Sequence, residues 1–150
     1  MAIRPIHISQ PQDLQLVGQA LQATAKSYSP YSHFEVGAAV RMEDGRVFSA
    51  SNQENAAYPA CVCAERVALL YATANSDSRP ECIAIVAKNA GRQTLQPVTP
   101  CGECRQVLRE MELRYHAPIR ILMCGAGQCL EADSAADLLP GEFSSDQLAR

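Results

Sequence analysis

The chain has 150 residues, a net charge of −3 and a pI of about 5.6. This length fits one domain, expected over residues 1–150, and the acidic balance counts against nucleic acid as a partner. The sequence shows neither a signal-peptide pattern nor an apolar run of about 20 residues, so we expect no membrane association and a cytoplasmic location. In such a reducing compartment, the seven cysteines favour metal binding over disulfides.

The first elements along the chain are a helix and a hairpin. Residues 13–28 predict a packing helix whose buried face carries Leu14, Val17, Leu21 and Ala25. Ser29-Pro30-Tyr31 ends that helix, and residues 34–42 predict a strand. Asp44-Gly45 is a hairpin turn signal, so residues 46–51 are expected to return beside the first strand.

Polar residues continue the returning strand. Asn52 and Glu54 alternate with Gln53, so both point to one face if the strand extends this far. On spacing alone they are equally consistent with a solvated strand end. Phe34, at the entrance of the first strand, is on the same grounds an ordinary core aromatic.

The next helix begins at a cysteine. From Cys63 onward, apolar residues repeat at helical spacing, and the expected face carries Val67, Leu70, Tyr71 and Ala74. Glu65 lies two residues beyond Cys63, so it does not share the face of that thiol. It is better placed as a neighbour of a metal, where a carboxylate exchanges protons with water, than as a ligand. Arg66 is expected to offset the negative charge of thiolate ligands from outside the metal shell.

A second cysteine pair starts a third helix. Cys101 and Cys104 follow Pro100, and Cys104 lies on an apolar stripe with Val107, Leu108, Met111 and Tyr115. A helix N-terminus lowers the pKa of a thiol, and thiolates are ligands of zinc. Two such helix starts could supply Cys63, Cys101 and Cys104 to one zinc ion. Three protein ligands leave the fourth position open, which is typical of catalytic rather than structural zinc.

The remaining segments alternate between strands and helices. Residues 82–88 and 119–124 predict strands, residues 89–99 a loop, residues 128–131 a last strand, and residues 137–139 a short helix. After an opening hairpin, this alternation predicts an α/β fold with one mixed sheet and helices on its faces.

Six short motifs, taken in order, resemble the small cytidine deaminases along nearly the whole chain. They are Ser29-Pro-Tyr-Ser-His-Phe34 with Val36-Gly-Ala-Ala39, Asn52-Gln-Glu-Asn-Ala56, Tyr58-Pro59, Cys63-Ala-Glu-Arg66, Pro100-Cys-Gly-Glu-Cys-Arg-Gln106 and Leu138-Leu-Pro140. The fourth and fifth of these motifs fit a known zinc deaminase signature, Cys-x-Glu followed by Pro-Cys-x-x-Cys. Departures from the family pattern occur at Ala57 and at Ala60-Cys61-Val62, beside the expected pocket.

The resemblance implies a fold, a reaction and a set of roles. The fold is a three-layer α/β/α sandwich around a mixed five-stranded sheet. The reaction is hydrolytic deamination of cytidine and deoxycytidine to uridine and deoxyuridine, with release of ammonia, in pyrimidine salvage. One zinc ion per subunit is held by the three thiols, and Glu65 moves the proton.

The resemblance also implies the substrate contacts and the assembly. Phe34 packs on the pyrimidine, and Asn52 and Glu54 bind the ribose hydroxyls. Ala64, Tyr58 and Phe143 complete the substrate contacts. Small members of this family are homotetramers with shared active sites, and Phe143 is the expected contribution to a neighbouring pocket.

Two alternatives remain open on the sequence. Cys61 with Cys63, Cys101 and Cys104 would make a four-thiolate structural zinc site in a binding module, with no use for Glu65. A second alternative keeps the chemistry but changes the substrate to a modified nucleoside or a base in nucleic acid. The acidic composition disfavours the nucleic acid.

Overall fold

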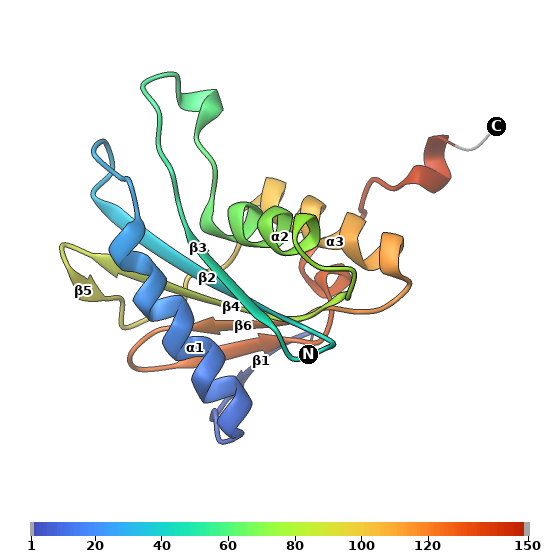
Figure 1. The fold of residues 1–150 in the computed structure, drawn as a ribbon, viewed down its shortest axis with the longest axis horizontal. Helices are drawn as coiled ribbons and strands as arrows, with labels where there is room; N and C mark the ends of the chain where they lie inside the picture. The colour runs from blue at the N-terminus through green and yellow to red at the C-terminus, as the bar shows by residue number, and fades with distance from the viewer. Residues whose placement is uncertain (1, 149–150) are drawn as a thin grey trace.

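The computed structural model describes residues 2–148 and shows an α/β fold built on one mixed sheet (Figure 1). The strands are β1 (Ile3–Ile6), β2 (Phe34–Met42), β3 (Val47–Ser51), β4 (Pro80–Asn89), β5 (Arg92–Gln93), β6 (Arg120–Cys124) and β7 (Cys129–Ala132). The helices are α1 (Pro11–Ala23), α2 (Ala64–Ala74) and α3 (Gly102–Tyr115), with short 3-10 turns η1 (Thr24–Lys26), η2 (Tyr58–Ala60), η3 (Ala135–Leu138) and η4 (Ser145–Leu148). The predicted fold class is confirmed.

The sheet is larger than expected. Seven strands take part, in the order β1-β7-β6-β4-β2-β3, with β5 paired to β4, so the expectation of five strands was wrong. The additional strands are β1 and β5, which are too short to show a clear alternation of polar and apolar residues. Among the strands of residues 2–148, only β4 and β6 pair in parallel, and α3 lies in the connection between them.

Helices cover both faces of the sheet (Figure 1). Helix α1 packs over β2 and β4, around a core that includes Leu16, Ala20 and Leu122. On the opposite face, α2 and α3 bury Leu69 and Leu108 in the larger core. Within residues 2–148, no helix is long and apolar enough to cross a membrane.

The buried face of α1 differs from the predicted one. Leu14 is 54% exposed, whereas Asp13, Leu16, Ala20 and Ala23 are buried. Apolar residues occur on more than one side of this helix, so periodicity alone chose the wrong side. A close backbone approach decides the orientation: a Cβ on Gly37 of β2 would lie 1.9 Å from the Ala20 carbonyl oxygen.

The buried face of α2 also differs from the predicted one. The predicted face carried Leu70 and Tyr71, but these side chains are 53% and 51% exposed. The helix instead buries Ala64, Glu65, Ala68, Leu69 and Ala72. A neighbouring face of α2 is therefore apolar yet about half exposed. For α3 the prediction is confirmed, since Cys104, Leu108 and Met111 are buried.

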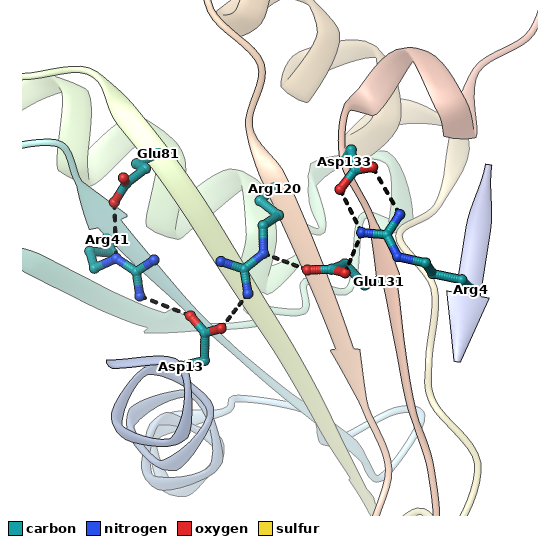
Figure 2. Close-up of polar contacts among 7 residues, drawn as sticks. All are labelled: Arg4, Asp13, Arg41, Glu81, Arg120, Glu131 and Asp133. Atoms are coloured by element: carbon teal, nitrogen blue, oxygen red, sulfur yellow. Dashed lines mark hydrogen bonds and ion pairs between the residues drawn. The ribbon is translucent and has the colours of Figure 1, made fainter. Parts of the chain in front are cut away.

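A chain of ion pairs runs from α1 across five strands, ending at Arg4 of β1 (Figure 2). Buried Asp13 contacts both Arg41 of β2 and Arg120 of β6. Arg41 also contacts Glu81 of β4 at 3.0 Å. From Arg120 the network continues through Glu131 of β7 at 2.5 Å. Because removal of one partner leaves a buried charge uncompensated, this network holds α1 in one orientation on the sheet.

Candidate active site

Three thiols meet where α2 and α3 begin. Cys63 is the N-cap of α2 and Cys101 the N-cap of α3, and neither cap has a side-chain hydrogen bond to its helix. The Cys101 sulfur lies 3.7 Å from that of Cys63 and 3.6 Å from that of Cys104. Cys104 is buried one turn into α3, whereas Cys101 is exposed. The free N–H groups of both first turns therefore face a cluster of potential thiolates.

The donor set fits zinc. All three sulfur atoms lie within 4.8 Å of one another, and the described residues contribute no fourth His, Cys, Asp or Glu to this group. Sulfurs that share one tetrahedral zinc at about 2.3 Å are roughly 3.8 Å apart, close to the distances observed here. Three thiolates leave one position open for water or substrate.

Cys61 lies outside this group, although it is only two residues from Cys63. Its thiol is hydrogen-bonded to the backbone of Asn55, accepting from the N–H at 3.3 Å and donating to the carbonyl oxygen at 3.6 Å. This arrangement gives no support to a closed four-thiolate site.

Positive charge accompanies the thiols. The Arg66 guanidinium donates to the Cys63 sulfur at 3.8 Å and pairs with Glu103 at 3.1 Å. Hydrogen bonds from Cys104 and Arg66 lower the pKa of the Cys63 thiol to about 5. The bond in which Cys104 donates to Cys63 raises the pKa of Cys104. One thiolate is thus already favoured in the protein alone, and Arg66 lies next to it, where it can offset its negative charge.

A cavity of about 290 Å³ opens beside the thiols. Its lining is Ser32, Phe34, Val36, Asn52, Cys63, Ala64, Glu65, Val98, Thr99 and Cys101. Glu65 is only 4% exposed, and this burial raises the pKa of its carboxyl group to about 7. A carboxyl group that titrates near neutrality, next to a metal-binding cluster, is suited to taking up and returning protons.

The sugar-binding candidates separate in the structure. Asn52 lines the cavity, but Glu54 does not. One Glu54 carboxylate oxygen instead accepts hydrogen bonds from the backbone N–H groups of Tyr31 and Ser32, at 3.0 and 3.2 Å. Hydrogen bonds to Ser32 lower the pKa of Glu54, which keeps it ionised. Glu54 therefore shapes the loop at the cavity mouth.

Two further predicted contacts lie outside this cavity. Tyr58 is 70% exposed and packs edge-on against Tyr31, with ring centroids 5.8 Å apart. Phe143 is 55% exposed, in a C-terminal segment that extends past α3 (Figure 1). Neither aromatic side chain is among the residues that line the cavity with Phe34 and Glu65.

The wall formed by Val98 and Thr99 was not predicted from sequence, because it belongs to a loop without regular periodicity. Residues outside the loop, from α3 and from the β6–β7 turn, hold it in place. Arg105 donates to the Pro100 carbonyl at 2.7 Å and to the Leu138 carbonyl at 2.9 Å. At Gly125, a Cβ would lie 2.3 Å from the Leu95 carbonyl oxygen, so only glycine allows the β6–β7 turn to support this loop. In the sequence, only Arg105, which follows Cys104 in the second cysteine motif, could have indicated that this loop is anchored.

The sheet, the paired helix starts and the open thiol cluster are those of an α/β protein with an open, zinc-type metal site. The family described as cytidine and deoxycytidylate deaminase zinc-binding region matches residues 10–116. The chain is 38% identical over 133 residues to a cytidine deaminase from Halalkalibacterium halodurans, covering 89% of this chain and 95% of that protein. It is 32% identical over 145 residues to a blasticidin-S deaminase from Bacillus cereus, covering 95% of this chain and 99% of that protein.

Solved structures agree with the sequence comparisons. The crystal structure of a cytidine deaminase from Burkholderia pseudomallei superimposes with a TM-score of 0.75 at 38% identity, covering 87% of this chain and 98% of that chain. The chain therefore belongs to the cytidine deaminase family. Both the family and the enzyme class predicted from the motifs are confirmed, and zinc is the cofactor that the thiol cluster fits.

Proposed function

We propose that this protein is a zinc-dependent hydrolase that converts cytidine and deoxycytidine to uridine and deoxyuridine, within a single domain of residues 1–150. The observation that carries the proposal is the burial of Glu65 in the same cavity as Cys63 and Cys101. Family membership supports the reaction, and the geometry supplies a proton carrier beside the metal-binding thiols.

In the proposed mechanism, Cys63, Cys101 and Cys104 hold the zinc ion. When bound, zinc supplies activation of water for attack on the pyrimidine ring. Glu65 accepts a proton from that water and transfers it to the ring nitrogen N3. The same carboxyl group then carries the second proton of the water to the departing amine at C4, so water and cytidine yield uridine and ammonia. Arg66 balances the charge of the thiolates.

The cavity lining favours a nucleoside over a nucleotide. Phe34 presents an aromatic surface to a base, and stacking on an aromatic side chain contributes about 1–3 kcal/mol. Ala64, as the first residue of α2, offers a backbone N–H without a partner inside the helix. None of the described residues lining the cavity is Lys or Arg, so no cation there would pair with a phosphate group. Asn52 is positioned to bind a sugar hydroxyl.

Assembly into a homotetramer completes the proposal. Leu70 and Tyr71 leave an apolar face of α2 largely exposed, and the side chains of Tyr58 and Phe143 are exposed as well. The backbone beside Phe143 is nevertheless fixed, because Gln106 of α3 donates to the Phe143 carbonyl at 2.9 Å. A fixed backbone with an exposed aromatic side chain is suited to closing the pocket of a neighbouring subunit. We assign the enzyme to pyrimidine salvage in the cytoplasm, where the thiol ligands stay reduced.

The decisive experiment is incubation of the purified zinc-loaded protein with a panel of aminopyrimidine nucleosides, measuring ammonia release and the ultraviolet change of the base. We expect turnover of cytidine and deoxycytidine and none of cytidine monophosphate. A protein that binds zinc but releases no ammonia from any nucleoside would contradict the proposal.

A cytosine nucleoside with a modified sugar is the second candidate substrate. It is favoured by the similarity to the blasticidin-S deaminase over 95% of this chain. The same panel decides between the two, since blasticidin S is included and the ratio of kcat/KM values ranks it against cytidine.

A further inference from the structure

The side chain of Asn52 is held by three hydrogen bonds before any substrate arrives. Its Oδ1 accepts from the backbone N–H of Val36 at 2.9 Å and from the hydroxyl of Ser27 at 2.6 Å. Its Nδ2 donates to the carbonyl oxygen of Phe34 at 2.9 Å. These partners fix the orientation of the amide group, because two donors require Oδ1 on one side and a carbonyl oxygen requires Nδ2 on the other.

The count of donors and acceptors leaves one group for a ligand. An Asn amide has two acceptor lone pairs and two N–H donors. Both lone pairs and one N–H are already used in the protein. Among the described residues, the second N–H of Asn52 has no partner, and Asn52 lines the cavity. The side chain therefore presents a single donor, which a hydroxyl oxygen of a sugar can accept.

Ser27 is the only side chain among the three partners of the Asn52 amide, because Val36 and Phe34 act through their backbones. It sits after η1 and is half buried. The Ser27 hydroxyl has one proton, and it must donate that proton to Asn52, because the amide oxygen can only accept. In the 3.2 Å contact between the two serine hydroxyls, Ser29 is then the donor. Backbone bonds also run between these segments, from Tyr28 N–H to the Asn52 carbonyl at 3.0 Å.

We propose that Ser27 is a positioning residue for sugar recognition: its hydroxyl locks the Asn52 amide so that the free N–H points at a sugar hydroxyl. This inference rests on the proposed function, in which Asn52 binds the sugar. Without the Ser27 hydroxyl, one Oδ1 lone pair is unsatisfied and the amide is held on fewer sides. The preorganisation that keeps the free donor aimed into the cavity is then weakened.

The test combines a variant with a substrate analogue. We expect Ser27→Ala to raise the KM for cytidine about threefold to tenfold, the effect of one hydrogen bond, with kcat unchanged because the bond serves binding and not chemistry. The same variant should leave kcat/KM for 2′,3′-dideoxycytidine unchanged, since that analogue lacks both ring hydroxyls. Ser27→Thr should restore wild-type values, because the extended backbone of Ser27 (φ −60°, ψ 134°) accepts a β-branched residue.

Ser29→Ala is the matched control. It removes a neighbouring hydroxyl that touches Ser27 but has no bond to Asn52, and its KM should stay close to that of the wild type. Thermal unfolding and zinc content of all variants establish that the fold is intact.

Three outcomes would overturn the inference. One is an unchanged KM for cytidine in Ser27→Ala, and another is an equal loss for cytidine and the dideoxy analogue, which indicates a general disturbance of the pocket. The third is equal kcat/KM for both substrates in the wild type, which would show that Asn52 does not recognise the sugar. Failure of the proposed function is distinct from all three, because the wild type would then release no ammonia from cytidine.

Discussion

At the scale of single residues, the site depends on what each thiol touches. Cys61 and Cys63 are two positions apart, yet only Cys63 points at the other two sulfurs. The Cys61 thiol is instead hydrogen-bonded to the backbone of Asn55, in the segment before α2. The sequence could name four candidate thiols, but the choice of three required the three-dimensional position of each sulfur.

The three-thiol assignment predicts a selective loss of metal. Replacing Cys63, Cys101 or Cys104 by Ala should lower zinc content well below one ion per chain and abolish turnover, because zinc retains only two protein ligands. Cys61→Ala is the matched control and should keep both zinc and activity. Metal analysis of the purified variants measures the outcome, and loss of zinc from Cys61→Ala would show that the site is closed by four thiolates.

Glu65 gives a second prediction at this scale. Glu65→Gln preserves the size of a side chain that is 4% exposed but cannot carry a proton. Zinc content should stay at the wild-type level, while kcat for cytidine should fall by at least ~10²–10⁴-fold, as for loss of general acid–base catalysis. Steady-state kinetics on zinc-loaded protein checks this, and turnover near that of the wild type would exclude Glu65 as the proton carrier.

At the scale of elements, position in the sheet depends on contacts that sequence patterns do not contain. The boundaries of β2 and the starts of α2 and α3 followed from periodicity, turn residues and the cysteine motifs. The buried faces of α1 and α2 did not, because both helices carry apolar residues on more than one side. The side that packs is selected by a partner: the backbone near Gly37 for α1, and the sheet with the cavity for α2.

The same limit applies to the candidate site. The proximity of Cys63, Cys101 and Cys104 could be predicted, because the cysteine motifs mark the starts of two helices and those starts meet in the fold. Val98 and Thr99 line the cavity through a loop anchored by Arg105 and Gly125, and such long-range anchors have no local signature. Glu54 shows the reverse case: the resemblance implied a contact with the ribose, whereas in the structure its carboxylate accepts hydrogen bonds from two backbone N–H groups and does not line the cavity.

The packing of α1 on β2 yields a stability prediction with an internal control. In Gly37→Ala, the new Cβ would lie 1.9 Å from a backbone oxygen of α1, so the helix must shift, at a cost of about 1–3 kcal/mol or more. Gly18→Ala, on α1 itself, adds a Cβ with no atom within 4 Å and should stabilise by about 0.5–1 kcal/mol through helix propensity. Urea denaturation measures both. Equal effects of the two substitutions would refute the close approach.

At the scale of the whole molecule, the protomer leaves its own active site partly open. The cavity holds Phe34 and Glu65, but Phe143 projects from a tail anchored on α3. That anchoring is firm, since Arg109 of α3 also pairs with Glu142 at 2.6 Å. The reaction needs a pocket from which bulk water is excluded. We therefore propose that this aromatic side chain, held at a fixed place outside its own pocket, serves the pocket of a neighbouring subunit.

Sharing of this kind predicts subunit complementation. A Glu65→Ala chain lacks the proton carrier but can lend Phe143, and a Phe143→Ala chain keeps Glu65 but lends no aromatic ring. Co-assembled, they form some pockets with Glu65 from one chain and Phe143 from the other, so activity should exceed the sum of the two separate homo-oligomers. Co-assembly of Glu65→Ala with Glu65→Gln is the control and should give no gain, because neither chain supplies a proton carrier. Native mass spectrometry verifies the mixed tetramers, and mixed tetramers without a gain in activity would place Phe143 in its own subunit's pocket or outside the reaction.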